Sequence, residues 1–278
     1  MTLSELQKAG KARLQRAEIE DAAFEADCLL ESATGYSRSQ CLVRGAEAVS
    51  ERVTTRFFSQ IARRIQGEPL QYILGKWSFY GRDFFVGEGV LIPRPETEEL
   101  VETAISVLRE NPHRVVFDLC AGSGCIGLTV AKEVPECTVY LFEKYDAAFS
   151  YLQKNAEALY VPNAHLIKAD ILADTPPDGV QADLLLSNPP YIPKRELPEL
   201  QKEVLREPST ALDGGADGLD FYRVIQNRWM PFVNADGTLL FECGDGQGSE
   251  IANLFESAKA AKVLFDFQNI DRFVQIIV

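Results

Sequence analysis

The spacing of apolar residues predicts a small helical N-terminal domain. Across residues 3–67 the apolar positions recur with a helical period. Ala22, Leu29 and Leu30 share one face of a segment that ends near Gly35. A later segment follows Ser50, which we expect to cap it, and has an apolar residue at every fourth position: Val53, Phe57, Ile61 and Ile65.

A change of period after Gly67-Glu68-Pro69 predicts the end of these helices. Two short runs follow, Trp77 to Tyr80 and Asp83 to Val86, with Gly81-Arg82 between them. Glycine at the first central position of a two-residue loop is typical of a β-hairpin. We therefore predict a helical domain, a hairpin linker and a larger domain, at residues 1–70, 71–92 and 93–278.

The larger domain has the alternating pattern of an α/β protein. It opens with a helix expected from near Pro95 to about Glu110. Strands are predicted at 115–120, 138–143, 165–169, 184–187, 238–243, 263–268 and 273–278, with helices after Gly124 and at 146–159, 221–232 and 248–258. This order indicates a doubly wound sheet. Only residues 269–272 separate the last two strands, so one of the two must run antiparallel.

A glycine-rich segment, Asp118-Leu119-Cys120-Ala121-Gly122-Ser123-Gly124, joins the first strand of this sheet to the next helix. Glycines at such a turn let a ligand approach the backbone, and the helix N-terminus offers free N–H groups. Gly122, Gly124 and Gly127 also satisfy the dinucleotide fingerprint, and Glu143 ends the next strand, where an acid binds ribose hydroxyls. The loop alone therefore does not separate NAD from S-adenosylmethionine (AdoMet).

Three features of the strand ends favour AdoMet. Asp118 is expected to face a ligand's ammonium group, which NAD lacks. Ala169-Asp170-Ile171 ends the third strand and suits the amine and the apolar face of adenine. Residues 188–191 end the fourth strand, so all these groups collect at the carboxyl edge, where open α/β sheets bind ligands. For Asp118, Glu143 and Asp170 taken singly, a cap or a solvated strand end is the structural alternative.

The segment Asn188-Pro189-Pro190-Tyr191 follows an apolar run, residues 182–186, that predicts a buried strand. The two prolines remove two N–H donors, so the carbonyls around Pro189 have no competing donor beside them. A flat group with two N–H bonds, an amide or the exocyclic amine of a base, can donate one to the Asn188 side chain and one to the Pro189 carbonyl. Tyr191 would cover its face. The alternative is a rigid strand exit with a satisfied asparagine.

Composition limits the partners of the chain. The 278 residues carry a formal net charge of -13, whereas nucleic-acid affinity comes mainly from Lys and Arg, so we expect no direct nucleic-acid binding. The six cysteines form no Cys-x-x-Cys pair and there are two histidines, so we expect no metal site. The N-terminus is polar and no apolar run approaches membrane-spanning length. We expect a cytoplasmic monomer that binds no membrane.

Several segments resemble the protein-(glutamine-N5) methyltransferases that modify peptide chain release factors, the HemK/PrmC family. The resemblance spans almost the whole chain. It is carried by residues 67–75, by Leu91-Ile92-Pro93-Arg94-Pro95-Glu96-Thr97-Glu98, by the glycine loop, by residues 188–193 and by residues 207–219. Asn-Pro-Pro-Tyr is shared with amino-methyltransferases that act on adenine in DNA. The Pro-Arg-Pro-Glu-Thr-Glu segment and the helical domain are more specific.

The resemblance implies a Rossmann-like class I AdoMet-dependent methyltransferase: a seven-stranded mixed sheet with its last strand antiparallel, a substrate-recognising helical N-terminal domain and a hairpin linker. The implied substrate is the glutamine of the Gly-Gly-Gln loop in release factors, and S-adenosyl-L-homocysteine is the product of the cofactor. The implied cofactor contacts are Cys120, Ala121, Gly122, Ser123, Gly124, Glu143, Ile171 and Asn188, to which the strand-end pattern adds Asp118 and Asp170. The implied catalytic residues are Asn188, Pro189, Pro190 and Tyr191.

The sequence departs from the family pattern at three positions. Cys120-Ala121 stands where Gly-Thr is more usual, Glu143 replaces the commoner Asp, and Ile171 stands where some members carry an aromatic residue. The alternative functions are methylation of a glutamine in another translation protein, methylation of adenine in nucleic acid, and a non-catalytic adaptor. Action on DNA would require base flipping and a basic surface. The sequence assigns no role to Arg94 or Glu242.

Overall fold

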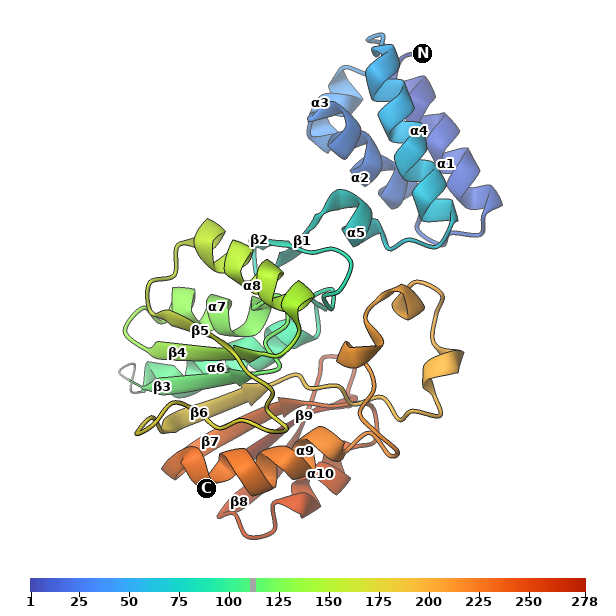
Figure 1. The fold of residues 1–278 in the computed structure, drawn as a ribbon. Coiled ribbons are helices and arrows are strands. Elements are labelled where there is room, and N and C mark those ends of the chain that lie inside the picture. Colours follow the sequence, from blue (N-terminus) through green and yellow to red (C-terminus); the bar gives the residue numbers. More distant parts are fainter. Residues whose placement is uncertain (111–113) are drawn as a thin grey trace. The chain divides into compact units, whose positions relative to one another are not determined.

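The computed structural model describes residues 1–110 and 114–278, which form two compact units (Figure 1). The helical unit comprises residues 1–76 and 201–206, and the sheet unit comprises residues 77–200 and 207–278. Neither described part of the chain contains a helix with the length and apolarity needed to cross a membrane.

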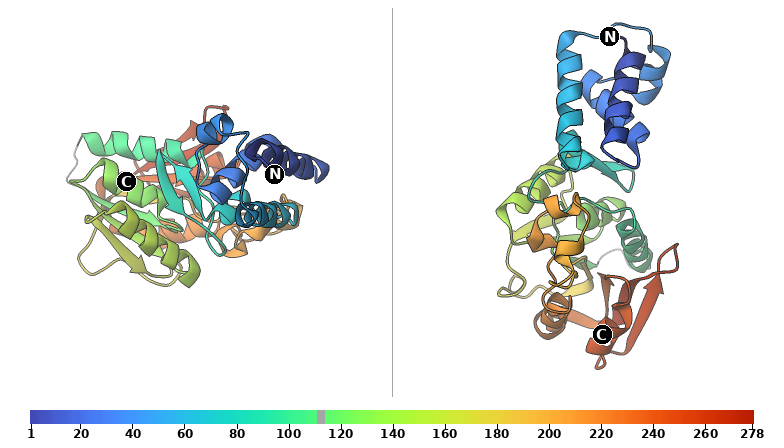
Figure 2. Two further views of the ribbon diagram at one scale, coloured as in Figure 1. Left: turned by 90° about the horizontal axis from the view of Figure 1, so that it is seen from above. Right: turned by 90° about the vertical axis from the view of Figure 1, so that its right-hand side faces the viewer.

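The helical unit contains five α-helices, in the part of the chain coloured blue to teal in Figure 2: α1 Leu3–Arg16, α2 Ala22–Thr34, α3 Arg38–Val43, α4 Glu51–Ile65 and α5 Leu70–Leu74. The Ser50 side chain accepts a hydrogen bond from the Val53 N–H, so the predicted cap of α4 is confirmed. Phe57 and Ile61 are fully buried, but Ile65 is 42% exposed. Ile65 is the last residue of α4 and lies outside the buried face that Phe57 and Ile61 form.

A buried ion pair joins two helices of this unit. The Arg64 guanidinium donates to both carboxylate oxygens of Glu25, at 2.6 and 3.0 Å, and to Glu203 at 2.6 Å. The Arg64 and Glu25 side chains are only 6% and 11% exposed. Segment 201–206 belongs to the helical unit and is joined to it by the Arg64–Glu203 pair and by a 3.1 Å hydrogen bond from Arg206 to the Gln66 carbonyl. No local pattern in the sequence predicts this connection.

The segment after Gly67 differs from the prediction in two ways. The helices do not end at Gly67-Glu68-Pro69, because α5 follows. The predicted hairpin is present, with β1 Lys76–Phe79 and β2 Arg82–Phe85, but its turn residues are Tyr80 and Gly81 rather than Gly81 and Arg82. Their φ angles of 49° and 70° are left-handed, as a type I′ turn requires, so glycine occupies the second central position.

The sheet unit contains a seven-stranded sheet in the order β5-β4-β3-β6-β7-β9-β8. The strands are β3 Val115–Leu119, β4 Thr138–Glu143, β5 Ala164–Lys168, β6 Ala182–Ser187, β7 Val233–Glu242, β8 Ala260–Phe265 and β9 Asp271–Ile277. The neighbours from β5 to β7 are parallel, and β9 is antiparallel to both β7 and β8. The prediction of one antiparallel strand is confirmed.

Helices cover both faces of the sheet (Figure 1). One face packs against α6 Thr97–Arg109, α7 Cys125–Glu133 and α8 Asp146–Leu159, and the other against α9 Asp220–Val224 and α10 Gly248–Leu254. Alternate residues of β6 enter the two cores, Leu184 and Leu186 on one side and Leu185 on the other. The helix predicted over 221–232 changes to a π turn after Val224 and to a 3₁₀ turn at Met230–Phe232, which contains a proline.

The strand register brings the ends of the central strands to one edge. Ser187, the last residue of β6, pairs with Leu119 of β3 and with Phe241 of β7, and Glu143 ends β4 beside them. This carboxyl edge carries the candidate site.

Candidate functional site

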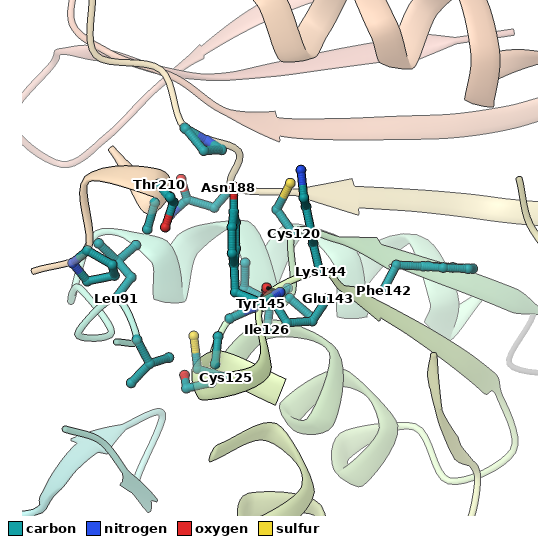
Figure 3. A pocket seen from close by; sticks show the side chains of 18 of the residues that line it. Leu91, Cys120, Cys125, Ile126, Phe142, Glu143, Lys144, Tyr145, Asn188 and Thr210 are labelled. Carbon is teal, nitrogen blue, oxygen red and sulfur yellow. Dashed lines mark hydrogen bonds between the residues drawn. The ribbon is translucent and has the colours of Figure 1, made fainter. Parts of the chain in front are cut away.

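A cavity that is open to solvent lies at the carboxyl edge of the sheet unit (Figure 3). Its walls come from strand ends, from the segment around Leu91 and from the segment around Thr210. The structure brings most of the predicted site residues together there: Cys120, Ala121, Gly122, Ser123, Glu143, Asp170, Ile171, Asn188 and Pro190. The predicted residues that do not line it are Asp118, Gly124, Pro189 and Tyr191.

The glycine loop turns sharply between β3 and α7. Gly122 has a φ of 56°, and a Cβ added to it would meet only the Cys120 carbonyl oxygen, 4.0 Å away. The space beside Gly122 is therefore open for a ligand to approach the backbone. Gly124 has a different role: a Cβ there would collide with Leu128 and Leu152, so glycine permits close packing of the helices behind the loop.

Glu143 fixes the loop from the end of the neighbouring strand. One carboxylate oxygen accepts from the Gly122 N–H at 2.9 Å and the other from the Tyr145 N–H at 2.8 Å. The side chain lines the cavity while the residue is only 6% exposed, and this burial raises the pKa of its carboxyl group. Each oxygen keeps a second acceptor position, which suits a ligand's hydroxyl groups.

Asp118 does not face the cavity, contrary to the expectation that it meets an ammonium group. It is fully buried, and its Oδ2 accepts a 2.9 Å hydrogen bond from the Gly127 N–H in the first turn of α7. Burial raises the pKa of this carboxyl group to about 7. The residue thus ties the strand to the helix behind the glycine loop.

Asp170 and Ile171 line the cavity beyond the end of β5. Lys144 forms a 2.8 Å ion pair with Asp170, whose other carboxylate oxygen accepts from the Leu172 N–H. The Ile171 carbonyl accepts from the indole N–H of Trp229 at 2.8 Å, which fixes the backbone here. Lys144 also lines the cavity, and no motif in the sequence marked it as a site residue.

The Asn188 amide belongs to a hydrogen-bonded chain of three side chains. Its Nδ2 donates to the Thr97 hydroxyl at 3.4 Å, and that hydroxyl donates to the Glu242 carboxylate at 2.6 Å. The nitrogen of the amide is therefore occupied on the protein side. The Pro-Arg-Pro-Glu-Thr-Glu segment marked the region of Thr97 in the sequence, but no pattern connected it with Glu242.

Arg94 lines the cavity from the same segment and pairs with Glu207. Glu207 also accepts from the Ile92 N–H at 2.9 Å and is almost fully buried. Two sequence-distant segments that carry the family resemblance, residues 91–98 and 207–219, are thus joined at the rim of the cavity.

The backbone of segment 188–191 is fixed by a hydrogen bond from the Gln247 side chain. Gln247 donates to the Tyr191 carbonyl at 3.0 Å and accepts from the Gly244 N–H at 2.9 Å. Tyr191 packs against the core on the α9 face of the sheet instead of lining the cavity. The expectation that its ring covers a bound ligand does not agree with this position.

The matches to known proteins cover both units of the chain. Residues 5–75 match the model of the PrmC N-terminal domain, and residues 100–227 match the methyltransferase small domain. The release factor glutamine methyltransferase of Geobacter sulfurreducens is 40% identical over 85% of this chain and 82% of its own length. That of Moorella thermoacetica is 36% identical over 98% of this chain and 97% of its own length.

The chain belongs to the release factor glutamine methyltransferase family. One solved structure shares the fold over most of the chain. A methyltransferase from Pyrococcus furiosus has a TM-score of 0.51 at 16% identity and covers 72% of this chain and 90% of its own. The family resemblance and the class I methyltransferase fold expected from the sequence are thereby confirmed.

One departure from the sequence pattern expected for this family has a steric cost in the structure. Cys120 has a φ of 61°, in the left-handed region that favours glycine. The glycine more usual at this position adopts that conformation without the steric cost that a Cβ brings. Cys120 lines the cavity, and burial raises the pKa of its thiol well above the ordinary value, so the thiol stays protonated.

Gly214→Ala is expected to lower methyl transfer by about 10-fold, because the new Cβ would lie 2.7 Å from the Tyr191 Cα and 2.8 Å from the Pro190 carbonyl oxygen. Displacing this backbone moves the acceptors of segment 188–191. Steady-state kinetics with AdoMet affinity measured in parallel tests this. The control is Gly179→Ala, where the added Cβ would meet no atom within 4 Å; its φ of 75° makes this substitution costly for the backbone, but it does not press on segment 188–191. Equal turnover of Gly214→Ala and the parent would contradict the expectation.

Proposed function

We propose that the chain transfers a methyl group from AdoMet to the side-chain amide N5 of the glutamine in the Gly-Gly-Gln motif of peptide chain release factors, with S-adenosyl-L-homocysteine as the coproduct. The observation that carries this proposal is the similarity, over more than four fifths of the chain, to relatives named release factor glutamine methyltransferase. The net charge of -13 supports the expectation that the chain binds no nucleic acid. We also propose that it acts in the cytoplasm as a monomer.

The residues at the carboxyl edge fit AdoMet. Glu143 presents acceptor positions for ribose hydroxyls, Gly122 leaves room for close approach, and Ile171 offers an apolar surface for adenine. We assign these residues, with Cys120, Ala121, Ser123 and Asp170, to the cofactor-binding wall. When bound, AdoMet supplies an electrophilic methyl group on a sulfonium centre.

The role of segment 188–191 is to orient the substrate amide. An amide nitrogen is a poor nucleophile because its lone pair is delocalised into the carbonyl. The Asn188 side-chain carbonyl and the Pro189 backbone carbonyl accept its two N–H bonds, which fixes the direction of the nitrogen and stabilises the positive charge that develops on it. Pro190 keeps this stretch free of a competing N–H donor. No strong base is needed before attack, because the proton leaves afterwards.

A radiolabel experiment tests the substrate. Incubation with labelled AdoMet and a release factor is expected to label the factor, and replacing its Gly-Gly-Gln glutamine by alanine is expected to abolish the label. Labelling of the alanine variant would overturn the assignment of the glutamine. Labelling of adenine in DNA would support the alternative of a base amino-methyltransferase, which the names of the relatives do not favour.

Glu143→Ala is expected to weaken AdoMet binding by about 2 kcal/mol, the contribution of charge-assisted hydrogen bonds. The variant also frees the Gly122 N–H that Glu143 now holds. Isothermal titration calorimetry with AdoMet measures the change. Glu157→Ala is the matched control, because Glu157 is an exposed residue of α8 that does not line the cavity. An unaltered affinity of Glu143→Ala would show that this carboxylate does not contact the cofactor.

A further inference from the structure

We propose that Thr97 and Glu242 are positioning residues that set which end of the Asn188 amide faces the substrate. The inference deepens the proposed function and rests on it, because the orientation matters only if an amide is the group to be bound. Neither residue has a role assigned by the family resemblance.

Residues from three distant parts of the chain meet at this point. Ser187 and Phe241 are paired in the parallel ladder of β6 and β7, so the residues that follow them, Asn188 just past the end of β6 and Glu242 at the end of β7, lie at the same level. Thr97 is the first residue of α6 and bridges the two side chains. The sheet register and a helix start together build the chain of hydrogen bonds.

The direction of the hydrogen bonds follows from the donor inventory. A carboxylate only accepts, so Glu242 obliges the Thr97 hydroxyl to donate its one hydrogen, at 2.6 Å. The Thr97 oxygen then serves only as an acceptor towards Asn188. The Asn188 NH₂ group must point at Thr97, and the side-chain carbonyl must point the other way.

Burial protects these hydrogen bonds, and their direction holds while Glu242 is ionised. Thr97 and Glu242 are each only 2% exposed, so water does not compete for their hydrogen bonds. The charges around Glu242 are Arg272 and Arg94, which favour the carboxylate, and Glu96, which opposes it; the Tyr191 and Cys243 side chains lie nearby. Burial raises the pKa of Glu242 to about 7, and the two arginines and Thr97 act against that rise.

The orientation decides what Asn188 recognises. With its carbonyl outward, Asn188 accepts an N–H bond from a substrate amide. With the amide reversed, two N–H bonds would face the N–H bonds of the glutamine, and a carboxylate would be the better ligand. The chain of hydrogen bonds from Glu242 through Thr97 to Asn188, which we call the relay, therefore makes the site bind glutamine in preference to glutamate.

The first test compares three variants. Thr97→Val removes the hydroxyl with little change in shape and is expected to lower kcat by about 10- to 100-fold, with AdoMet affinity within twofold of the parent. Thr97→Ser keeps the hydroxyl and is expected to restore most of kcat. The matched control is Thr129→Val, because Thr129 is fully buried and its hydroxyl has no hydrogen-bond partner among the described residues. It is expected to keep kcat.

The second test measures selectivity. A Gly-Gly-Gln peptide and its Gly-Gly-Glu analogue compete with the release factor as inhibitors of methyl transfer. We expect the parent to bind the glutamine peptide at least about 10-fold more tightly than the glutamate peptide, and Thr97→Val to bring this ratio close to one. If Thr97→Val only disturbed the fold, the binding of both peptides would weaken by the same factor.

The outcomes separate the two proposals. If the parent does not methylate the release factor, the proposed function fails. If the parent methylates it and Thr97→Val keeps both its kcat and its peptide selectivity, the relay is overturned while the function stands. If Thr97→Val loses kcat but keeps the selectivity ratio of the two peptides, the relay is also overturned, because Thr97 would then have a structural role only.

Discussion

Asn188→Ala is expected to lower the rate of methyl transfer on the order of 10³-fold, similar to the loss of one preorganised group that stabilises a transition state. The side chain that accepts one N–H bond of the glutamine amide would be gone. The amide would then turn freely about its remaining contact at the Pro189 carbonyl. AdoMet affinity is expected to change little, because Glu143 and the glycine loop lie elsewhere on the cavity wall.

Single-turnover kinetics with a release factor, together with calorimetry for AdoMet, measure the two quantities separately. Asn163→Ala is the matched control. The Asn163 amide donates to the backbone of Ala131 and Cys137, and the residue does not line the cavity. The control is expected to lose stability and to keep its rate. Unchanged turnover in Asn188→Ala would refute the orientation mechanism.

Arg64→Ala is expected to lower the free energy of unfolding of the helical unit by about 3–5 kcal/mol, the usual cost of breaking a buried ion pair. The substitution would leave the Glu25 carboxylate, which is 11% exposed at its side chain, without its cation. It would also release Glu203 and so remove one of the two polar links of segment 201–206 among the described residues, the other being the hydrogen bond from Arg206 to the Gln66 carbonyl.

Arg63→Ala is the control for this substitution. Arg63 is the neighbouring residue of α4, and its pair with Glu68 is exposed, so we expect a loss below about 1 kcal/mol. Because the chain has two units, hydrogen exchange of α2 and α4 amides is a better measure than a single melting temperature. Equal protection in Arg63→Ala and Arg64→Ala would show that the buried pair adds no stability beyond that of an exposed one.

Local patterns predicted the elements well where one residue decides a boundary. The Ser50 cap lies where the sequence placed it, and the helix predicted at residues 146–159 has these bounds. The hairpin turn was misplaced by one residue because Tyr80 adopts a left-handed φ that the sequence rules assign to glycine. The helix from 221 was predicted as uninterrupted, although its second half is a π turn followed by a 3₁₀ turn at Pro231.

The candidate site was predicted in its composition but not in its contacts. Strand ends in a parallel sheet share an edge, so the order of strands along the chain was enough to expect the residues that end them in one place. Asp118 shows the limit of that reasoning. Asp118 lies near the same end of its strand, but its carboxyl group accepts a hydrogen bond from the Gly127 N–H, because a buried carboxyl group needs a hydrogen-bond donor within the fold.

The sequence by itself determined the α/β order, the family and the segment 188–191, since each is written in local spacing and motif. Only the tertiary structure decided which residues form the hydrogen bonds that orient the Asn188 side chain. Thr97 lies 91 positions from Asn188 and Glu242 lies 145 positions from Thr97. Strand register and helix packing bring them within hydrogen-bonding distance, and no periodicity along the chain encodes a contact of that range.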